Sequence, residues 1–210
     1  MAGLRMRGIA KSYGGRPVLR GIDLDVGATE TVAVLGANGA GKSTLLRVAA
    51  TLARPSDGML EVAGVDARAE PEQARHGLSI LTQEAPLYPE LSPREHLAWW
   101  ARAQAMPDAD PDARLIPAGL AAVAHRPART LSRGQRQRLA LAMALLPDRP
   151  VLLLDEPFAA LDDAGAAWLA AELRARRGRQ AVLMALHDPA QAAAVADRVQ
   201  LLRDGRLEAA

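Results

Sequence analysis

One glycine-rich octapeptide, Gly36-Ala37-Asn38-Gly39-Ala40-Gly41-Lys42-Ser43, combines the residue types that bind phosphate groups. Its glycines let successive backbone N–H groups converge on an anion, and Lys42 adds a compact positive charge. The hydroxyl of Ser43 suits Mg²⁺, and the next hydroxyl, that of Thr44, can reach a further phosphate. The octapeptide matches the complete phosphate-loop pattern. We therefore expect a nucleoside triphosphate and Mg²⁺ here, held by Gly36, Asn38, Gly39, Gly41, Lys42, Ser43 and Thr44.

Two adjacent carboxylates, Asp155 and Glu156, follow the apolar run 151–154. Such a run is typical of a strand buried in a parallel sheet, and ligands of open α/β sheets gather at the carboxyl ends of the strands. Asp155 is expected to hold Mg²⁺, and Glu156 to orient and polarise the water that attacks the γ phosphate. With Lys42, these residues predict ATP hydrolysis.

A third motif, Leu131-Ser132-Arg133-Gly134-Gln135, offers a second anion site. A turn with this composition that leads into a helix presents backbone N–H groups and the positive end of the helix dipole. Since the phosphate loop already serves one nucleotide, we expect this second anion to be the ATP of another subunit.

The elements that must position these motifs alternate between strands and helices, which predicts an α/β fold. We expect a P-loop domain over 1–210 with a parallel core sheet, a small antiparallel β region and a short inserted helical lobe at about 85–130. Strands are predicted at 3–9, 18–26, 30–35, 59–62, 78–82, 151–154, 181–186 and, as a hairpin, 199–207. Helices are predicted at 43–52, 92–105 and 164–177, with a loop at 107–117.

Taken together, the motifs resemble those of the nucleotide-binding subunit of ATP-binding-cassette (ABC) transporters, over nearly the whole chain. The resemblance implies that residues 131–135 are the family signature and 160–162 its D-loop. Three further residues gain roles from it. It places Gln83 as a catalytic and metal-binding glutamine, His187 as a catalytic switch histidine, and Tyr13 as the ring that stacks on adenine. The nucleotide would also contact Ser132, Gly134, Gln135 and Asp162. Arg133 and Ala160 depart from the commoner Gly and Ser.

The partners implied by the resemblance are a second copy of the chain, paired head to tail, and an integral membrane permease. The protein would then lie at the cytoplasmic face of the inner membrane. Residues 131–140 and 155–158 are similar to the haem-exporter ATPase of cytochrome c maturation. Alternatives are an ATPase for another exporter, of a drug, lipid or metal, a soluble ABC ATPase acting on DNA or ribosomes, and a non-hydrolytic scaffold.

Composition excludes several other classes of site. The 210 residues contain no cysteine, so thiolate chemistry is excluded, and His76, His96 and His125 lack the spacing of metal ligands. The pI near 9.5 accompanies a net charge of only +2 and 3% aromatic residues, so no nucleic-acid partner is expected. We expect no secretory signal in residues 1–15 and no membrane span. Of Trp99 and Trp100, one is expected to pack inward; the other meets a membrane partner or the core of the lobe.

Overall fold

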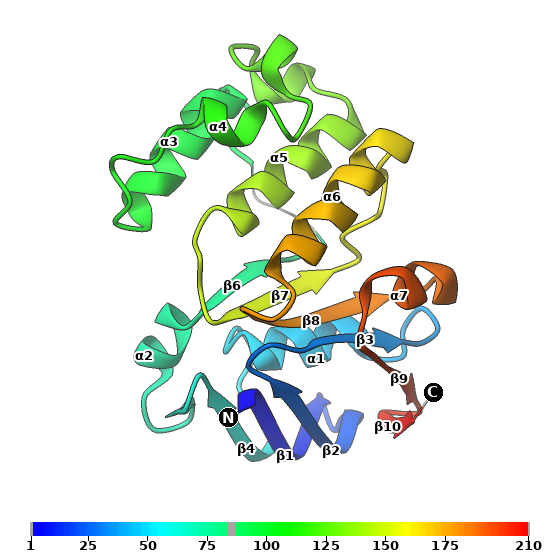
Figure 1. Cartoon of the computed structure of the whole chain (residues 1–210). Helices are drawn as coiled ribbons and strands as arrows, with labels where there is room; N and C mark the ends of the chain where they lie inside the picture. The colour runs from blue at the N-terminus through cyan, green and yellow to red at the C-terminus, as the bar shows by residue number, and fades with distance from the viewer. Residues whose placement is uncertain (1, 84–86, 210) are drawn as a thin grey trace. The chain divides into compact units, whose positions relative to one another are not determined.

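The computed structural model describes residues 2–83 and 87–209 (Figure 1). Its described residues form two compact units. Unit 1 comprises those of 1–83, 149–156 and 173–210, and unit 2 those of 84–148 and 157–172. Unit 2 contains the stretch 85–130 expected as a helical lobe and continues beyond it. The assignment of the whole chain to one domain stays a prediction.

Unit 1 begins with an antiparallel sheet of four strands in the order β2-β1-β4-β5. Alternation of apolar and polar residues explains its long strands. In β2, Leu19, Ile22, Leu24 and Val26 are buried, while most of the residues between them are exposed. This confirms the expected antiparallel region, although its strands are longer than predicted. The strands are β1 (Ala2–Tyr13), β2 (Arg16–Gly27), β4 (Asp57–Val62) and β5 (Val65–Asp66).

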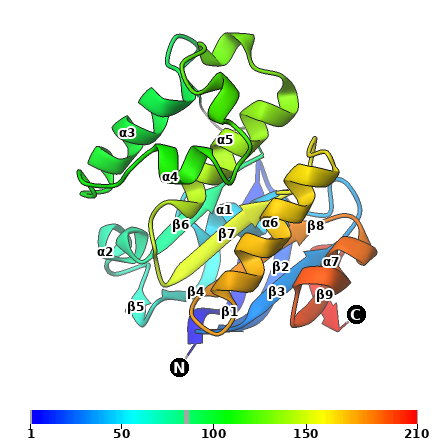
Figure 2. The same cartoon turned by 45° about the horizontal axis from the view of Figure 1, so that its top comes forward.

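The second sheet of unit 1 has six strands in the order β10-β9-β3-β8-β7-β6 (Figures 1 and 2). All its pairings are parallel except that of β9 with β10, as expected for the core and the closing hairpin. Every residue of β7 and β8 is buried, which explains their continuous apolar sequences. The strands are β3 (Thr31–Leu35), β6 (Leu78–Leu81), β7 (Val151–Asp155), β8 (Ala181–Leu186), β9 (Arg198–Arg203) and β10 (Arg206–Ala209).

Helix α1 (Lys42–Ala49) lies between the two sheets of unit 1, in contact with β7 and β8 of one and β1 and β2 of the other. Its buried Leu45, Leu46 and Val48 belong to a single core to which both sheets contribute. The same unit contains α2 (Pro71–His76) and α7 (Pro189–Val195). Helix α1 is thereby fixed by packing along its length.

Unit 2 is helical, with α3 (Pro93–Ala103), α4 (Asp112–Leu115), α5 (Arg133–Leu145) and two short 3-10 turns, Ala121–Val123 and Ala128–Thr130. Helix α6 (Asp163–Arg176) starts in this unit. Leucine and alanine side chains from α3, α4 and α5 form its core. Trp100 packs inward and donates from Nε1 to the carbonyl of Met143 at 2.8 Å.

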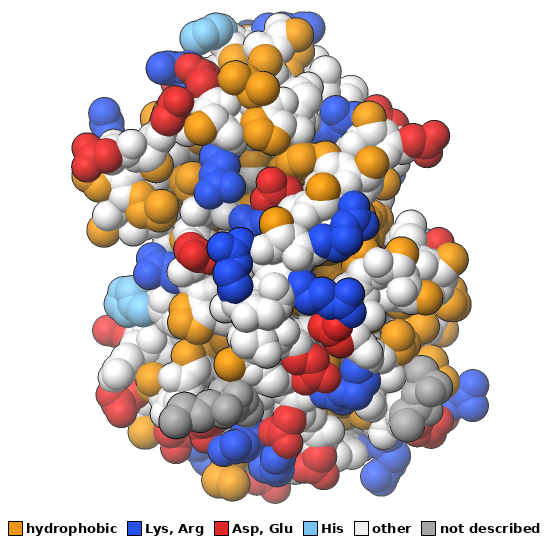
Figure 3. All heavy atoms as spheres, viewed as in Figure 1, with side chains coloured by type: hydrophobic (Ala, Val, Ile, Leu, Met, Phe, Trp, Pro, Cys, Tyr) orange, Lys and Arg blue, Asp and Glu red, His pale blue; other side chains and the backbone are white. Residues whose placement is uncertain are grey.

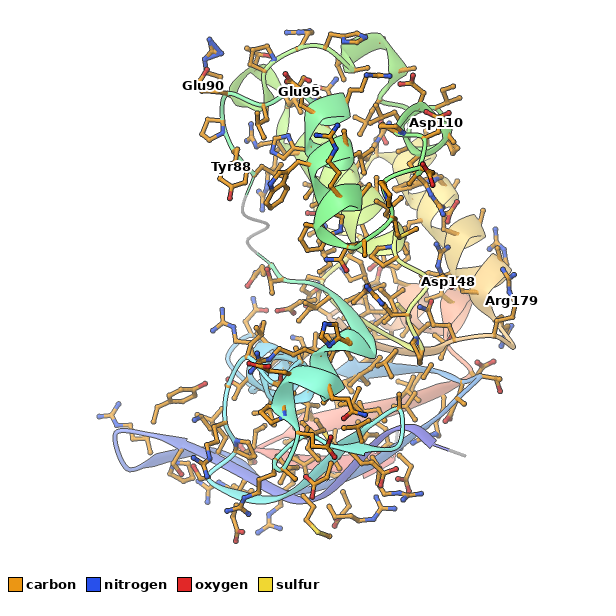
Figure 4. All side chains as sticks on the ribbon, turned by 90° about the vertical axis from the view of Figure 1, so that its left-hand side faces the viewer. Tyr88, Glu90, Glu95, Asp110, Asp148 and Arg179 are labelled. Carbon is orange, nitrogen blue, oxygen red and sulfur yellow. The ribbon has the colours of Figure 1, made fainter. Side chains whose placement is uncertain are left out.

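Trp99 is 43% exposed, and its ring centroid lies 5.3 Å from that of Tyr88, edge-on, and 5.9 Å from that of Trp100 (Figure 4 labels Tyr88). Trp100 is thus the tryptophan that packs inward, as expected of one of the two. His96 is fully buried, where Nε2 accepts the N–H of Tyr88 at 2.9 Å and Nδ1 lies 2.9 Å from the carbonyl of Ser92. These contacts make His96 a packing residue, and burial lowers its pKa. Within the described residues there is no group of three His, Cys, Asp or Glu side chains suited to a metal.

Several short elements differ from the sequence-based expectation. Helix α1 ends at Ala49, three residues before the predicted end at Leu52, because Thr51 takes a left-handed conformation with φ +58°. The stretch 107–117, expected as a loop, contains α4. The elements β5, α2 and α7 were not predicted, since they have two to seven residues and too few positions to show a period.

Candidate active site

The sheet order brings the predicted catalytic residues to one edge of unit 1. Strands β6, β7, β8 and β3 are neighbours and parallel, so the segments that follow them emerge side by side. Gln83 follows β6, Glu156 follows β7, His187 follows β8, and the phosphate loop follows β3. Ligands of open α/β sheets bind at such an edge.

Glu156 lies between a lysine and a histidine. Its Oε1 is 3.6 Å from Nζ of Lys42, and its Oε2 is 2.6 Å from Nδ1 of His187. An ionised carboxylate only accepts hydrogen bonds, so Nδ1 is the donor. Lys42 is only 7% exposed, and its ammonium also donates to the carbonyl of Gly36 at 2.7 Å. Three residues predicted to be catalytic therefore meet through one carboxylate.

Tight packing against neighbouring strands explains two glycines of the phosphate loop, Gly36 and Gly41. A Cβ on Gly36 would lie 2.6 Å from the carbonyl oxygen of Leu202. Gly41, the residue before α1, has φ +105°, and a Cβ there would meet Val18 at 3.1 Å. Larger residues would displace the loop from its neighbouring strands. The structure thus holds the start of α1 and Lys42 in a fixed place.

Asp155 and Ser43 fit the oxygen ligation that Mg²⁺ prefers. Asp155 is 4% exposed, and its Oδ1 has no hydrogen-bond partner among the described residues. Burial raises the pKa of Asp155, while the nearby Ser43 hydroxyl and the charges of Arg47 and Lys42 act in the opposite direction. A buried carboxylate oxygen without a partner is suited to a cation. The two residues would hold Mg²⁺ through the carboxylate and the hydroxyl.

The signature motif caps helix α5 in unit 2. The N–H of Gln135 donates to Oγ of Ser132 at 3.1 Å, and the N–H of Ser132 donates to Oε1 of Gln135 at 2.9 Å. This reciprocal capping box satisfies one N–H of the first turn. Those of Arg133 and Gly134 have no acceptor within the helix. They are suited to an anion, as the sequence predicted.

The D-loop is bound to the same helix by contacts that sequence analysis missed. Arg138 forms an ion pair with Asp162, whose Oδ1 also accepts the N–H of Gly165 at 2.9 Å. The Gly165 N–H and then Arg138 lower the pKa of Asp162. A Cβ on Gly134 would lie 2.8 Å from the carbonyl oxygen of Ala160. The two motifs of unit 2 therefore form one packed group.

Two predicted residues make fewer contacts. Tyr13, at the end of β1, is 47% exposed, and Nζ of Lys11 lies 4.7 Å from its ring centroid. Gln83 is exposed, and the described residues show no contact between its side chain and Glu156, Lys42 or His187. The adenine role of Tyr13 and the metal and catalytic roles of Gln83 stay predictions.

A family model described as ABC transporter matches residues 19–159. The chain belongs to this family. Its relatives include a protein of Nocardia farcinica named aliphatic sulfonates import ATP-binding protein SsuB 3, which is 42% identical over 98% of this chain and 79% of the relative. The Fe(3+) ions import ATP-binding protein FbpC of Streptomyces coelicolor is 38% identical over 97% of this chain and 60% of the relative.

A third relative, the sn-glycerol-3-phosphate import ATP-binding protein UgpC of Ralstonia nicotianae, is 34% identical over 99% of this chain. The chain spans 58% of that relative, so it covers about three fifths of two of these proteins. The family match over residues 19–159 begins within β2 and includes the phosphate loop, the signature and the two carboxylates.

Two solved structures agree with the fold. The structure of an ATP-binding subunit of an ABC transporter has a TM-score of 0.89 and 28% identity over 98% of this chain and 88% of that chain. A dimeric post-hydrolysis state of the ATP-binding cassette MJ0796 with ADP and Pi has a TM-score of 0.85 and 25% identity over 98% of this chain and 96% of that chain. The P-loop α/β fold is confirmed, and the protein is an ABC-type ATP hydrolase.

Proposed function

We propose that this ATP hydrolase powers the import of a small solute through a separate membrane permease. The observation that supports hydrolysis is the position of Glu156 between Lys42 and His187. The three relatives compared above carry the names of import proteins for sulfonates, Fe³⁺ and sn-glycerol-3-phosphate. Those names support import, and none of them supports the expected haem export.

Each side chain of the site has a separate role in hydrolysis. Lys42 neutralises the phosphate oxygens, the Glu156 carboxylate polarises the attacking water, and His187 holds that carboxylate in place and contacts the γ phosphate. Mg²⁺, held by Asp155 and Ser43, would withdraw negative charge from the phosphates. Gln83 follows the strand next to β7 and would complete the set.

The chain is proposed to act as a head-to-tail homodimer. The free N–H groups at the start of α5, in Arg133 and Gly134, would bind the γ phosphate of the ATP held by the partner's phosphate loop. The dimeric state of MJ0796 with ADP and Pi is a precedent for pairing in the family. No helix among the described residues could span a membrane. Attachment to the cytoplasmic face through the permease is part of the proposal.

Replacement of Glu156 by Gln tests the hydrolytic mechanism. Glutamine keeps the size of the side chain but cannot accept a proton, so turnover should fall by about 10²-fold or more while ATP still binds. The ATP-bound dimer should then persist, because its release depends on loss of the γ phosphate. The measurements are phosphate release and light scattering with and without Mg-ATP.

Two variants serve as controls for this experiment. Glu208→Gln removes an exposed carboxylate from β10 and should leave turnover and association unchanged. Ser132→Arg in the Glu156→Gln background should abolish the ATP-dependent dimer, because it blocks the start of α5. Parental turnover in Glu156→Gln, or a dimer that forms without ATP, would contradict the mechanism.

Deletion of the gene in its host tests the direction and cargo. Import predicts poor growth when a sulfonate, a phosphorylated glycerol or Fe³⁺ must be taken up at low concentration, with c-type cytochromes retained in haem-stained gels. Loss of c-type cytochromes with normal uptake would refute import and restore the haem exporter. Complementation with the parental gene, and not with Glu156→Gln, shows that hydrolysis is required.

A further inference from the structure

A cavity in unit 1 lies beside the carboxyl end of α1, away from the phosphate loop at its other end. Its volume is about 290 Å³, near the lower limit of ~300 Å³ for small-molecule sites. Val48, Leu60 and Ala67 line it with apolar side chains, and all three are buried. The cavity can therefore receive the apolar part of a small molecule.

Three arginines, Arg54, Arg68 and Arg75, line the same cavity, and no acidic residue does. Within the described part of the chain, none of the three forms an ion pair. Many other arginines do have a carboxylate partner: Arg5 and Arg7 with Asp25, Arg94 with Asp112, Arg129 with Glu90, Arg138 with Asp162, Arg177 with Asp197 and Arg198 with Glu30. The lining thus carries three positive charges that no ion pair among the described residues neutralises.

Two carboxylates near the cavity accept backbone N–H groups. Asp57 Oδ1 accepts the N–H of Gly58 at 2.7 Å, and Asp66 Oδ1 accepts that of Arg68 at 2.8 Å. Arg75 donates from Nε to the hydroxyl of Thr51 at 2.9 Å, which fixes the position of its guanidinium. The terminal nitrogens of a guanidinium held in this way can still form a fork to an anion.

Stabilisation of the end of α1 does not account for these arginines. The carbonyls of Leu46, Arg47 and Val48 already accept N–H groups from residues 50–53 at 2.8–3.0 Å. The residual charge at a helix terminus is about half an electron, whereas the arginines carry three full charges. The charge that remains is available to a ligand.

From this geometry we infer that the cavity binds a small organic anion, with a phosphate or sulfonate group at the arginines and an apolar body against Val48, Leu60 and Ala67. Planar guanidinium groups bind such oxyanions through paired hydrogen bonds. The anion comes either from a free metabolite or from a lipid headgroup. The site is separate from that of ATP, so the inference does not depend on the proposed import function.

Calorimetric titration with hexyl phosphate, in the absence of nucleotide, tests the site directly. The parent should bind it, and Arg54→Gln/Arg68→Gln should weaken binding by about tenfold or more, because two charge-assisted contacts are lost. Ala53→Leu keeps the charge and fills part of the cavity, so it should also weaken binding. Hexanol and inorganic phosphate, each lacking one half of the ligand, should bind more weakly than hexyl phosphate.

Matched variants exclude diffuse attraction and binding at the phosphate loop. Arg174→Gln/Arg206→Gln removes the same charge from exposed arginines outside the cavity and should leave affinity unchanged. Lys42→Ala should also retain binding. Equal affinities in the parent and in Arg54→Gln/Arg68→Gln would overturn the inference, and so would an equal loss in either control or no effect of Ala53→Leu.

Sedimentation with vesicles distinguishes the two sources of the anion. Vesicles of phosphatidylcholine with phosphatidic acid are compared with phosphatidylcholine alone, for the parent and Arg54→Gln/Arg68→Gln. Arginine-dependent sedimentation with the acidic vesicles supports a headgroup, and arginine-dependent binding of hexyl phosphate alone supports a soluble ligand. Arginine-dependent binding of neither probe would refute the site.

Discussion

Glu156 occupies an unusual backbone conformation, with φ +48°. For a residue with a Cβ, the left-handed region costs about 1–2 kcal/mol, so such residues persist only where their surroundings fix them. Here the N–H of Glu156 donates to the carbonyl of Ala185 at 3.0 Å, and the side chain reaches Lys42 and His187. Strained residues cluster at functional sites. The backbone therefore gives a second reason to choose Glu156 as the catalytic carboxylate.

Replacement of Lys42 by Ala should weaken ATP binding by about tenfold or more, since a charge-assisted contact to the phosphates is lost. Titration with a fluorescent nucleotide measures the change. Arg206→Ala removes a positive charge from β10 and should bind as the parent does. Equal affinities for Lys42→Ala and the parent would show that the nucleotide does not bind at this loop, and circular dichroism verifies that both variants fold.

Functional residues could be predicted from the sequence where their motif is short and continuous along the chain. Lys42, Ser43 and Asp155 could be named because their motifs carry their chemistry within a few residues. His187 required the resemblance to a family, because a histidine at a strand end has no spacing of its own. The ion pair of Arg138 with Asp162 joins residues 24 positions apart. Such a partner is determined by tertiary packing, so no local pattern indicates it.

Two helices of unit 2 begin with the same kind of capping box. Ser92 and Glu95 form a capping box on α3, as Ser132 and Gln135 do on α5. At α5 the N–H groups of Arg133 and Gly134 have no acceptor within the helix. At α3 the first residue is Pro93, which has no N–H, and the N–H of Arg94 donates to the carbonyl of Ala124 at 3.1 Å. Only the α5 box belongs to the signature motif, where an anion is predicted to bind. The α3 box is a cap without a predicted anion, so it serves as an internal control.

Ser132→Ala and Ser92→Ala should each lower the free energy of unfolding, by about 0.5–2 kcal/mol, because each removes a cap. Urea unfolding measures this loss. Only Ser132→Ala should also weaken the ATP-dependent dimer in the Glu156→Gln background. If Ser92→Ala weakens that dimer equally, the effect of Ser132 is structural alone, and the proposed contact with the partner's ATP is wrong.

Polar contacts join the starts of β3 and β9 in unit 1, where the first residue of each strand bonds to the residue that precedes the other strand. Asp197 Oδ2 accepts the N–H of the buried Thr31 at 2.9 Å, and Asp197 Oδ1 accepts from Nε of Arg177 at 2.7 Å. Arg198 donates from Nε to Glu30 at 2.7 Å. Burial raises the pKa of Asp197, but the Thr31 N–H and Arg177 outweigh it, so the pKa lies below its usual value.

A lowered carboxyl pKa makes the folded state bind fewer protons than the unfolded state. Stability from Asp197 is thus present above the usual Asp pKa of ~3.9 and is lost as the pH falls through the folded pKa. Asp197→Asn should cost about 1–3 kcal/mol at neutral pH and flatten the decline in acid. Urea unfolding across this range tests it, with the exposed Asp108→Asn as control. An unchanged acid dependence would contradict the role of Asp197.

The helices and strands that could be predicted from the sequence are the longer ones. The long alternating strands and the buried runs of the parallel sheet were recognised because each shows several periods of its pattern. Boundaries moved where one residue changed conformation, as at Thr51. The cavity at the arginines could not be predicted at all, because its lining joins α1, β4 and the start of α2 through tertiary packing.

Positive and negative residues are nearly equal in number over the chain. The chain has 26 basic and 24 acidic residues, and Figure 3 shows blue and red side chains interspersed over the visible face. Neutralising the phosphates of a duplex takes a cluster of unpaired Lys and Arg side chains. Ion pairs use many of the arginines here. The absence of a nucleic-acid partner stays a prediction.

The place of β3 in the six-stranded sheet has a consequence for biosynthesis. This strand leads into the phosphate loop, yet its neighbours are β8 and β9, whose residues 181–203 are synthesised about 140 residues after the loop. The antiparallel sheet of β1, β2 and β4 can pair within the first 62 residues. Pairing between distant segments is slow, because the intervening chain must first be ordered. The nascent chain therefore carries its phosphate loop before the two strands that flank β3 exist, and a nucleotide can stabilise the folded sheet only after residues 181–203 have been made.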